Sequence, residues 1–211
     1  MDVPKIKDLI SGGDPEYLEA LARQLFRAGF GLSGSFLGTL TPNEAVTIGK
    51  REGPHSNTRQ MASGDPFQAC QYAQYVDKGP HADTRQAACG DPRYAYLYAF
   101  QVDKGPRDDT RQAACGDPHY AYLYALDVDK EYREDTRQAA CEDPYYAYKY
   151  AFLVDKGPRN DTRRGACGSA PYAYQYALRV DKRFHEETWA AAQETTYKAP
   201  YRTEIEGAPG I

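Results

Sequence analysis

The segment DTRQAACGDPRYAYLYAFQVDKGPRD, residues 83–108, decides the fold because it recurs along the chain. Close copies occupy residues 109–134 and 135–160, and looser copies occupy residues 57–82 and 161–186. The period is therefore 26 residues. A fixed period between about 20 and 50 residues is typical of a solenoid.

The first half of each unit is predicted to be a short helix, called helix A. Asp83 has the side chain of a helix N-cap, and Gln86 follows at the spacing of a capping box. The helix is expected over residues 84–89, with Gly90 as its C-terminal breaker.

The second half is predicted to be a longer helix, called helix B. Asp91 is a second N-cap, and Pro92 suits the first helical position because an N–H there has no intrahelical partner. The helix is expected to run for thirteen residues through Lys104, with Gly105 at the C′ position and Pro106 behind it. These paired cap signals favour a helix over a strand.

One unit cannot fold alone, because ordering its residues costs about 40 kcal/mol and a single helix pair buries too little apolar area to offset that. Stacked neighbours can bury enough. The sequence therefore predicts an all-α fold, a right-handed α-solenoid of two-helix 26-residue repeats. Its expected parts are a helical cap with a Gly-rich joint over residues 1–56, five repeats over 57–186, and a capping helix with an extended tail over 187–211.

Helix B is expected to be apolar on most of its surface, since a solenoid helix has neighbours on three sides. On a helical wheel, the side assigned to helix A carries Ala95, Tyr98, Ala99 and Val102. A second flank, with Tyr96 and Phe100, is assigned to the next repeat.

Three columns of helix B vary freely between repeats and lie four residues apart, so they form a continuous surface when the helices stack. We call this surface the variable stripe. Its members are Phe67, Arg93, His119, Tyr145, Pro171, Gln71, Leu97, Leu123, Lys149, Gln175, Tyr75, Gln101, Asp127, Leu153 and Arg179. It is either a solvent face or a partner-binding face, and its mixture of Leu, Tyr, Phe and charge suits a protein better than a phosphate backbone.

An aspartate falls near the end of each helix B, where the helix dipole disfavours an acid. These aspartates are Asp77, Asp103, Asp129, Asp155 and Asp181. The expected partners are arginines of helix A, at Arg85, Arg111, Arg137 and Arg163. We predict an Asp–Arg ladder between successive repeats, in which Asp103 meets Arg111.

A second basic column occupies the loops before helix A. Its members are His55, His81, Arg107, Arg133, Arg159 and His185. A column of cations could bind an anionic partner, but acidic N-caps follow two residues later, so we expect neutralisation in place. The chain has Lys+Arg 26 against Asp+Glu 30 and a net charge of −4, and a nucleic-acid partner is not expected.

Two motifs associated with chemistry are discounted. Residues 29–34 match GxGxxG, but a helix-like segment precedes them and no parallel-sheet pattern follows, so we expect a flexible joint. The cysteines lack CxxC spacing and disulfide geometry, and we expect buried free thiols at Cys70, Cys89, Cys115, Cys141 and Cys167. The sequence indicates no catalytic centre, no metal site and no cofactor.

The two ends depart from the repeat. Residues 41–44, Thr-Pro-Asn-Glu, begin a helix of the N-terminal cap, and Trp189 replaces the arginine column in the last helix A. Residues 195–211 have little helical pattern, and we expect either disorder or a docking arm. The side chains available for docking are those of Tyr197, Tyr201 and Ile205.

The helix B pattern DPxYAYxYAxxVxKG, as in residues 91–105, resembles short helical repeats of tailed phages and large DNA viruses. The resemblance covers residues 57–186, and the helix A text TRQAAC departs from it. It implies an α-solenoid of viral origin, and it implies no catalytic residues.

We therefore expect a non-enzymatic structural or assembly protein, a virion component that contacts coat protein or its own copies through the variable stripe and the tail. The alternative is an intracellular adaptor that binds one protein along the stripe. No run approaches 18 apolar residues and the N-terminus has no uninterrupted apolar segment, so neither a membrane span nor a secretory signal is expected. The expected location is the host cytoplasm or the virion.

Overall fold

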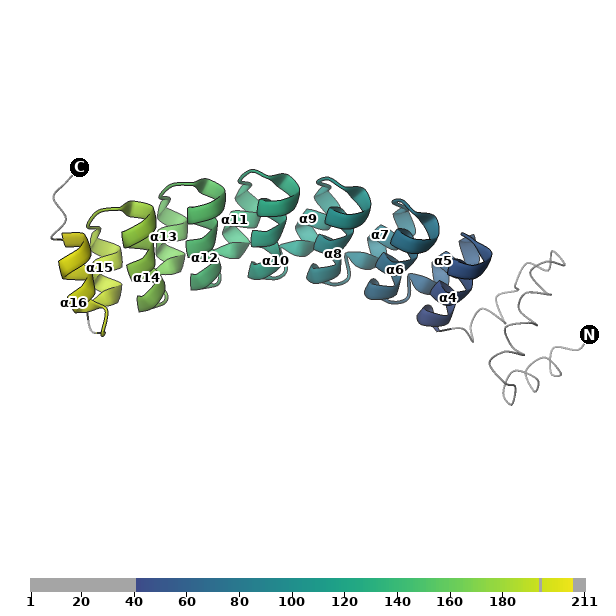
Figure 1. Ribbon diagram of the computed structural model, residues 1–211, viewed down its shortest axis with the longest axis horizontal. Coiled ribbons are helices and arrows are strands. Elements are labelled where there is room, and N and C mark those ends of the chain that lie inside the picture. The colour runs from purple at the N-terminus through teal and green to yellow at the C-terminus, as the bar shows by residue number, and fades with distance from the viewer. Residues whose placement is uncertain (1–40, 194, 207–211) are drawn as a thin grey trace, which may run out of the picture.

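The computed structural model describes residues 41–193 and 195–206, and this part of the chain is helical with no strand. Helix pairs follow one another along a gently arched rod, so the predicted all-α solenoid of two-helix repeats is confirmed (Figure 1). None of the described helices has the length and apolar character needed to cross a membrane.

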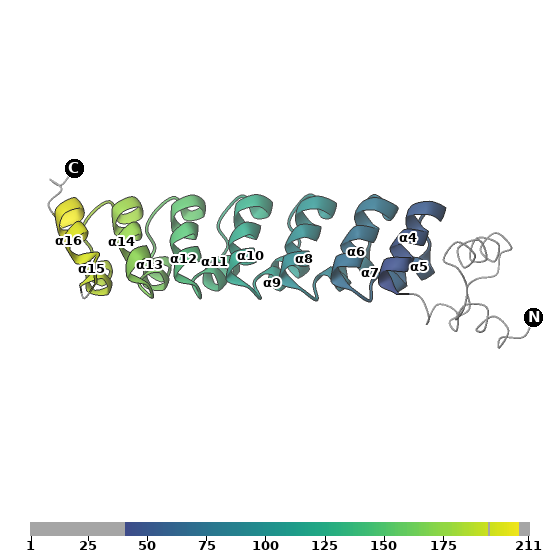
Figure 2. The same cartoon turned by 60° about the horizontal axis from the view of Figure 1, so that its bottom comes forward.

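Two rows of helices run along the rod (Figure 2). The A row holds the first helix of each pair: α5 (Ser56–Ala62), α7 (Ala82–Ala88), α9 (Asp108–Ala114), α11 (Glu134–Ala140), α13 (Asn160–Ala166) and α15 (Glu186–Ala192). Within the described residues, the B row holds α4 and then the second helix of each pair: α4 (Pro42–Glu52), α6 (Pro66–Tyr72), α8 (Pro92–Tyr98), α10 (Pro118–Leu123), α12 (Pro144–Tyr150), α14 (Ala170–Tyr176) and α16 (Lys198–Tyr201).

Helix A begins earlier than predicted. In α7 the N-cap is His81, whose Nδ1 accepts the N–H of Asp83 at 3.4 Å. The predicted capping role of Asp83 is wrong because the chain is already helical at Ala82, which places Asp83 inside the first turn. An acid there still interacts favourably with the helix dipole.

Helix B widens into a π-helix, whereas the sequence predicted a uniform helix. The π segments are η1 (Ala73–Asp77), η2 (Ala99–Asp103), η3 (Tyr124–Asp129), η4 (Ala151–Asp155), η5 (Ala177–Asp181) and η6 (Arg202–Glu206). Lys104 ends η2 in the left-handed conformation with φ 56°, and the N–H of Gly105 then bonds to the carbonyl of Ala99 at 3.2 Å. The left-handed role expected of Gly105 is therefore taken by the lysine, as at Lys78, Lys130, Lys156 and Lys182.

A buried tyrosine fastens the two helices of each pair. The hydroxyl of Tyr98 accepts the N–H of His81 at 3.0 Å and lies 3.1 Å from the carbonyl oxygen of His81 and 2.8 Å from Thr84 Oγ1. The same fully buried pair recurs as Tyr72 with Thr58, Tyr124 with Thr110, Tyr150 with Thr136, Tyr176 with Thr162 and Tyr201 with Thr188.

Successive repeats share one core. Ala99 packs in a cluster with Ala114, Tyr124 and Val128 of the next repeat. This small residue therefore serves the contact between repeats, whereas the helical wheel assigned it to helix A of its own repeat. Ala45 and Val46 of α4 pack in the same way with Ala62, Tyr72 and Val76 of the next pair.

The C-terminal segment is the second helix of the last pair, and the predicted docking arm is wrong. Tyr201 is fully buried with its hydroxyl 2.7 Å from Thr188 Oγ1, and Ile205 is 5% exposed. Both belong to a core cluster with Tyr174, against whose ring Tyr197 packs at 5.5 Å between centroids. These side chains close the end of the core, so they are not displayed on an extended tail.

Candidate partner-binding surface

The variable stripe lies along the B row. Its most exposed apolar members are Phe67, Tyr75 and Tyr145, with 43%, 50% and 36% of their surface accessible. Its exposed polar members are Arg93, Gln101 and Arg179. The partly buried members are Gln71, Leu97, His119, Leu123, Asp127, Lys149, Leu153, Pro171 and Gln175.

Ring contacts join the stripe from one repeat to the next. His119 on α10 stacks against Tyr146 on α12 with centroids 5.0 Å apart. Tyr145 on α12 lies 5.3 Å from Tyr172 on α14. These contacts link the stripe residues of α10 and α12 to the neighbouring repeats α12 and α14.

Sequence reasoning missed two aromatic side chains beside the stripe. Phe100 is 49% exposed and Phe152 is 38% exposed. Phe100 stacks on Tyr96 with centroids 5.9 Å apart, and it is Tyr96 that contacts Tyr120 of the next repeat. The assignment of Phe100 to the contact between repeats is therefore wrong, since its ring is half exposed and Tyr96 makes the contact.

Stripe carboxylates also tie neighbouring repeats together. The hydroxyl of Tyr96 donates to Asp127 Oδ2 at 2.9 Å, and burial together with this hydrogen bond raises the pKa of Tyr96. A carboxylate outside the stripe makes the same kind of link at the end of the rod, where the hydroxyl of Tyr174 on α14 donates to Glu204 of the last pair at 2.6 Å. Desolvation and this bond raise the pKa of Tyr174 to about 12. These carboxylates hold the hydroxyl groups of tyrosines from the preceding repeat, in addition to bringing negative charge to the surface.

The aspartates of the predicted ladder pair with the arginine of their own repeat rather than with that of the next repeat. Arg111 Nη2 lies 2.9 Å from Oδ1 of Asp129, the aspartate of its own repeat. The predicted pairing of Arg111 with Asp103 is wrong, because helix A meets the end of helix B of its own repeat. The same in-repeat pairing, at 2.7 Å, joins Arg59 to Asp77 and Arg163 to Asp181.

Two arginines point to the next repeat instead. Arg85 Nε donates to Asp109 of the following repeat at 2.9 Å, and its Nη1 stays 3.5 Å from Asp103. Within the described residues, Asp103 accepts no hydrogen bond although its side chain is fully buried, and burial raises its pKa. The same arrangement recurs at Arg137, Asp161 and Asp155.

The loop column of basic residues serves the fold. Nδ1 of His81 caps α7, and the residue two positions later is not a cap. Arg133 Nη2 lies 2.7 Å from Glu131, and Arg159 lies over the ring of Tyr132 at 4.9 Å. Imidazole capping recurs at His55 and His185. Arg107 occupies the N-cap position of α9, but its side chain makes no capping hydrogen bond.

The cysteines are free thiols at the ends of A helices, except Cys70 on α6. Burial raises the pKa of Cys89 to about 11 and that of Cys115 to about 12, so these thiols stay protonated at neutral pH. Among the residues that the structure describes, no three His, Cys, Asp or Glu side chains are grouped to hold a metal. The GxGxxG segment, residues 29–34, lies outside the described residues.

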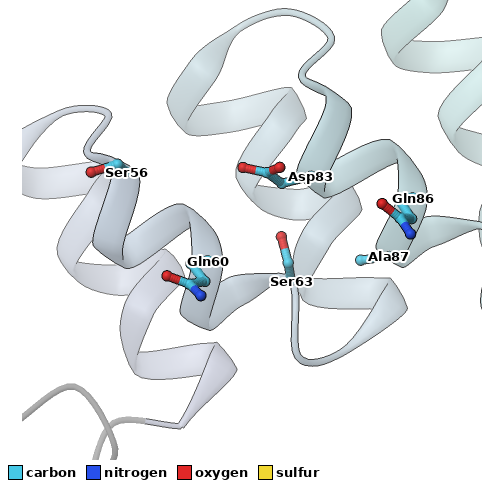
Figure 3. Close-up of a pocket in the computed structure, with 6 residues that line it drawn as sticks. All are labelled: Ser56, Gln60, Ser63, Asp83, Gln86 and Ala87. Atoms are coloured by element: carbon cyan, nitrogen blue, oxygen red, sulfur yellow. The ribbon is translucent and has the colours of Figure 1, made fainter. Parts of the chain in front are cut away.

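An open polar groove on the A row was not predicted. It lies between α5 and α7, and both helices contribute to its walls (Figure 3). The residues that line it are Ser56, Gln60, Ser63, Asp83, Gln86 and Ala87. The sequence feature that could have indicated this groove is the glutamine that recurs at one position of helix A. The sequence analysis did not treat this position as part of a surface.

Comparison with family models, with curated proteins and with solved structures finds no match for this chain. The resemblance to phage and viral repeats therefore stays a prediction. The function has to be inferred from the two surfaces described above, the variable stripe and the groove on the A row.

Proposed function

We propose that this chain is a non-enzymatic helical-repeat scaffold that binds a protein partner along the variable stripe. Five of the seven large apolar side chains exposed in the described residues lie on the B row, which is the observation that supports this function. They are Phe67, Tyr75, Phe100, Tyr145 and Phe152. Exposed aromatic side chains gathered on one row of helices are typical of protein interfaces.

The charge on the stripe favours a protein partner over a nucleic acid. Arg93, Lys149 and Arg179 are interspersed with the carboxylate of Asp127 and with apolar side chains. A phosphate backbone requires an uninterrupted excess of basic residues, and the whole chain has a net charge of −4. Mixed charge around aromatic anchors instead provides specificity for a protein.

Two partners are compatible with such a surface. In an assembly role, the chain is a virion component and the stripe contacts coat protein or further copies of the chain. In an adaptor role, the stripe binds one other protein in the cytoplasm. Because Tyr201 and Ile205 are folded into the core, self-association is expected to use the side of the rod rather than the tail.

Light scattering over a range of concentrations tests whether copies of the chain associate. Assembly predicts multiples of the 23.6 kDa chain mass for the wild type and a monomer for the double variant Phe100→Asp, Phe152→Asp. The matched control, Gln86→Asp with Gln138→Asp, has the same sequence spacing on the A row and should behave as wild type. A monomeric wild type excludes self-association and leaves coat protein or one other protein as the partner.

The adaptor role is then tested by photo-crosslinking in the cells that produce the protein. A crosslinking side chain at Leu97 should form specific adducts with one protein, and the same group at the edge residue Lys104 should not. A chain that is monomeric and forms no adduct from Leu97 would contradict the proposed function in both forms.

A further inference from the structure

Identical stretches of helix A hold their arginine in different ways. The sequence Thr-Arg-Gln-Ala-Ala-Cys occurs three times without change, around Arg85, Arg111 and Arg137. Arg111 donates to the buried aspartate of its own repeat, whereas Arg85 and Arg137 donate to an acid of the next repeat. Because the helix text is the same in all three, it leaves both positions available to the arginine.

Arg85 lies between two acids. Its Nε donates to Oδ2 of Asp109 on α9 at 2.9 Å, and its Nη1 is 3.5 Å from Oδ1 of Asp103 at the end of η2. Asp103 is the counterpart of Asp129, which lies 2.9 Å from Arg111 Nη2. Arg85 therefore completes the bond to its own repeat if it approaches Asp103 as closely as Arg111 approaches Asp129.

Arg137 repeats this geometry two repeats later. Its Nε donates to Oδ2 of Asp161 on α13 at 2.7 Å, and its Nη1 is 3.7 Å from Oδ1 of Asp155. Within the described residues, Arg137 Nη1 and both carboxylate oxygens of Asp155 are buried without a hydrogen bond. A buried donor and acceptor that do not bond cost free energy, and a small approach recovers it. The bond to the next repeat is therefore opposed by an attraction to the arginine's own repeat.

The two acids available to each arginine differ in their contact with solvent. The side chains of Asp109 and Asp161 are 50% and 39% accessible, whereas those of Asp103 and Asp155 are almost completely buried. Dissolved salt screens exposed ion pairs strongly and buried pairs much less. Higher salt therefore weakens the bond to the next repeat more than the bond within the repeat.

We propose that Arg85 and Arg137 are salt-sensitive switches between neighbouring repeats. Each exchanges between the exposed acid of the next repeat and the buried aspartate of its own. In the first position Arg85 ties α7 to α9, and Arg137 ties α11 to α13. In the second position this tie between A helices is lost. The switch does not depend on which protein binds the variable stripe, so its failure would leave the proposed function intact.

Exchange of the arginine Nε–H proton with water, measured by NMR on the full chain, tests the switch. The signal of Arg85 is assigned by its loss in Arg85→Lys. In Asp109→Ala this proton should stay as protected as in wild type, because the arginine moves to Asp103. In the double variant Asp103→Ala, Asp109→Ala both acids are gone, and the proton should exchange about tenfold faster or more.

The matched control uses a repeat whose arginine already bonds within its own repeat. Asp135 occupies the position of Asp109 in the repeat after Arg111. Asp135→Ala should leave both the chemical shift and the proton exchange of Arg111 unchanged, since Arg111 is held by Asp129 and Asp108.

The dependence on salt is measured on the same signals. The Nε chemical shift of Arg85 in Asp109→Ala defines the second position. Between about 0.01 M and about 1 M salt the screening length falls from about 30 Å to about 3 Å. The wild-type Arg85 signal should move toward the second position over this range, and the Arg111 signal should not follow it.

Two results would overturn the proposal. Fast proton exchange of Arg85 in Asp109→Ala alone would show that the arginine moves into solvent instead of to Asp103. A wild-type Arg85 signal that does not move with salt would show that salt does not shift the arginine between its two positions. Circular dichroism melting verifies that each variant remains folded.

Discussion

Repeats with the same helix A text hold their central arginine in two different ways. In one, Arg111 donates to both oxygens of Asp129 at distances between 2.9 and 3.1 Å. In the preceding repeat, Arg85 donates to Asp109 of its neighbour, and Asp103 is buried without a hydrogen bond. We call the first arrangement closed and the second open.

The two arrangements alternate along the rod. The closed repeats contain Arg59, Arg111 and Arg163, and the open repeats contain Arg85 and Arg137. An arginine that has one buried and one exposed carboxylate within reach can stabilise either its own repeat or the junction with the next. The contacts of a nearly periodic sequence therefore differ from repeat to repeat. At every second repeat a buried carboxylate accepts no hydrogen bond and keeps only a longer ion pair, at 3.5 Å for Asp103 and 3.7 Å for Asp155.

The largest expected difference between closed and open repeats follows from removing the aspartate. Asp129→Ala takes the bidentate partner from a mostly buried arginine and should lower the free energy of unfolding by about 3 kcal/mol. Asp103→Ala removes a carboxylate without hydrogen bonds and should cost less than about 1 kcal/mol. Urea unfolding at pH 7 measures both. Equal losses would show that the two repeats do not differ in solution.

A change shared by both kinds of repeat should have the same effect in each. Tyr98→Phe and Tyr124→Phe both remove the hydroxyl that accepts a backbone N–H and contacts a buried threonine. Each should lower the free energy of unfolding by about 1.5 kcal/mol, because a buried N–H loses its partner. Urea unfolding of the two variants checks this. Unequal losses would mean that the ion pair changes how firmly the tyrosine is held.

The open repeats should also give the protein a distinctive response to pH. Burial raises the pKa of Asp103 and of Asp155, so the folded chain binds protons more readily there than the unfolded chain does. Their contribution to stability is present below the unfolded value of about 3.9 and is lost as pH rises through the folded pKa. The double substitution Asp103→Asn, Asp155→Asn replaces both ionisable groups with neutral amides, so this loss of stability with rising pH no longer occurs.

At pH 7 the double asparagine variant should therefore be more stable than wild type by about 1 kcal/mol. The gap should close as the pH falls toward 4, because the wild-type carboxylates then become protonated. Thermal melts from pH 4 to pH 7 provide the measurement. A gap that widens toward acid pH would show that the folded protein stabilises both carboxylates as anions, and it would contradict the raised pKa of Asp103 and Asp155.

Periodicity predicted the repeat, its two helices and the all-α fold because each copy restates its own caps, as Asp91 and Pro92 do. The ion-pair register was not predictable in the same way. Arg111 has aspartates of two neighbouring repeats as candidates in the sequence, and only the packing decides between them. The final helix was missed because Tyr201 and Ile205 keep the core spacing while the caps around them have changed.

The π-helical turn at the end of helix B also could not be predicted from the sequence pattern. A helical wheel at a constant angle per residue assumes one hydrogen-bond pattern throughout helix B. The extra residue in the last turn changes the faces of residues after Tyr98, which explains the misplaced Phe100. It also moves the left-handed position from Gly105 to Lys104. The stripe columns are defined by variation between repeats, and their role as a binding face stays a prediction.

The smallest expected effect concerns this left-handed lysine, which open and closed repeats share. Lys104→Gly and Lys130→Gly should each raise the free energy of unfolding by about 0.5 kcal/mol, because glycine adopts positive φ without the cost of a Cβ. Gly105→Ala is the control and should be nearly neutral, since φ is not positive there and a Cβ would meet no atom within 4 Å. Urea unfolding measures all three.

A larger gain in the free energy of unfolding for Lys104→Gly than for Lys130→Gly would show that the end of helix B also differs between open and closed repeats. Each lysine directly follows the aspartate whose pairing differs, Asp103 in the open repeat and Asp129 in the closed one. An added gain in the open repeat would mean that relaxing the backbone lets its buried carboxylate reach a partner. Equal gains would mean that the end of helix B is set by its backbone alone, and that the alternation belongs to the arginine side chains.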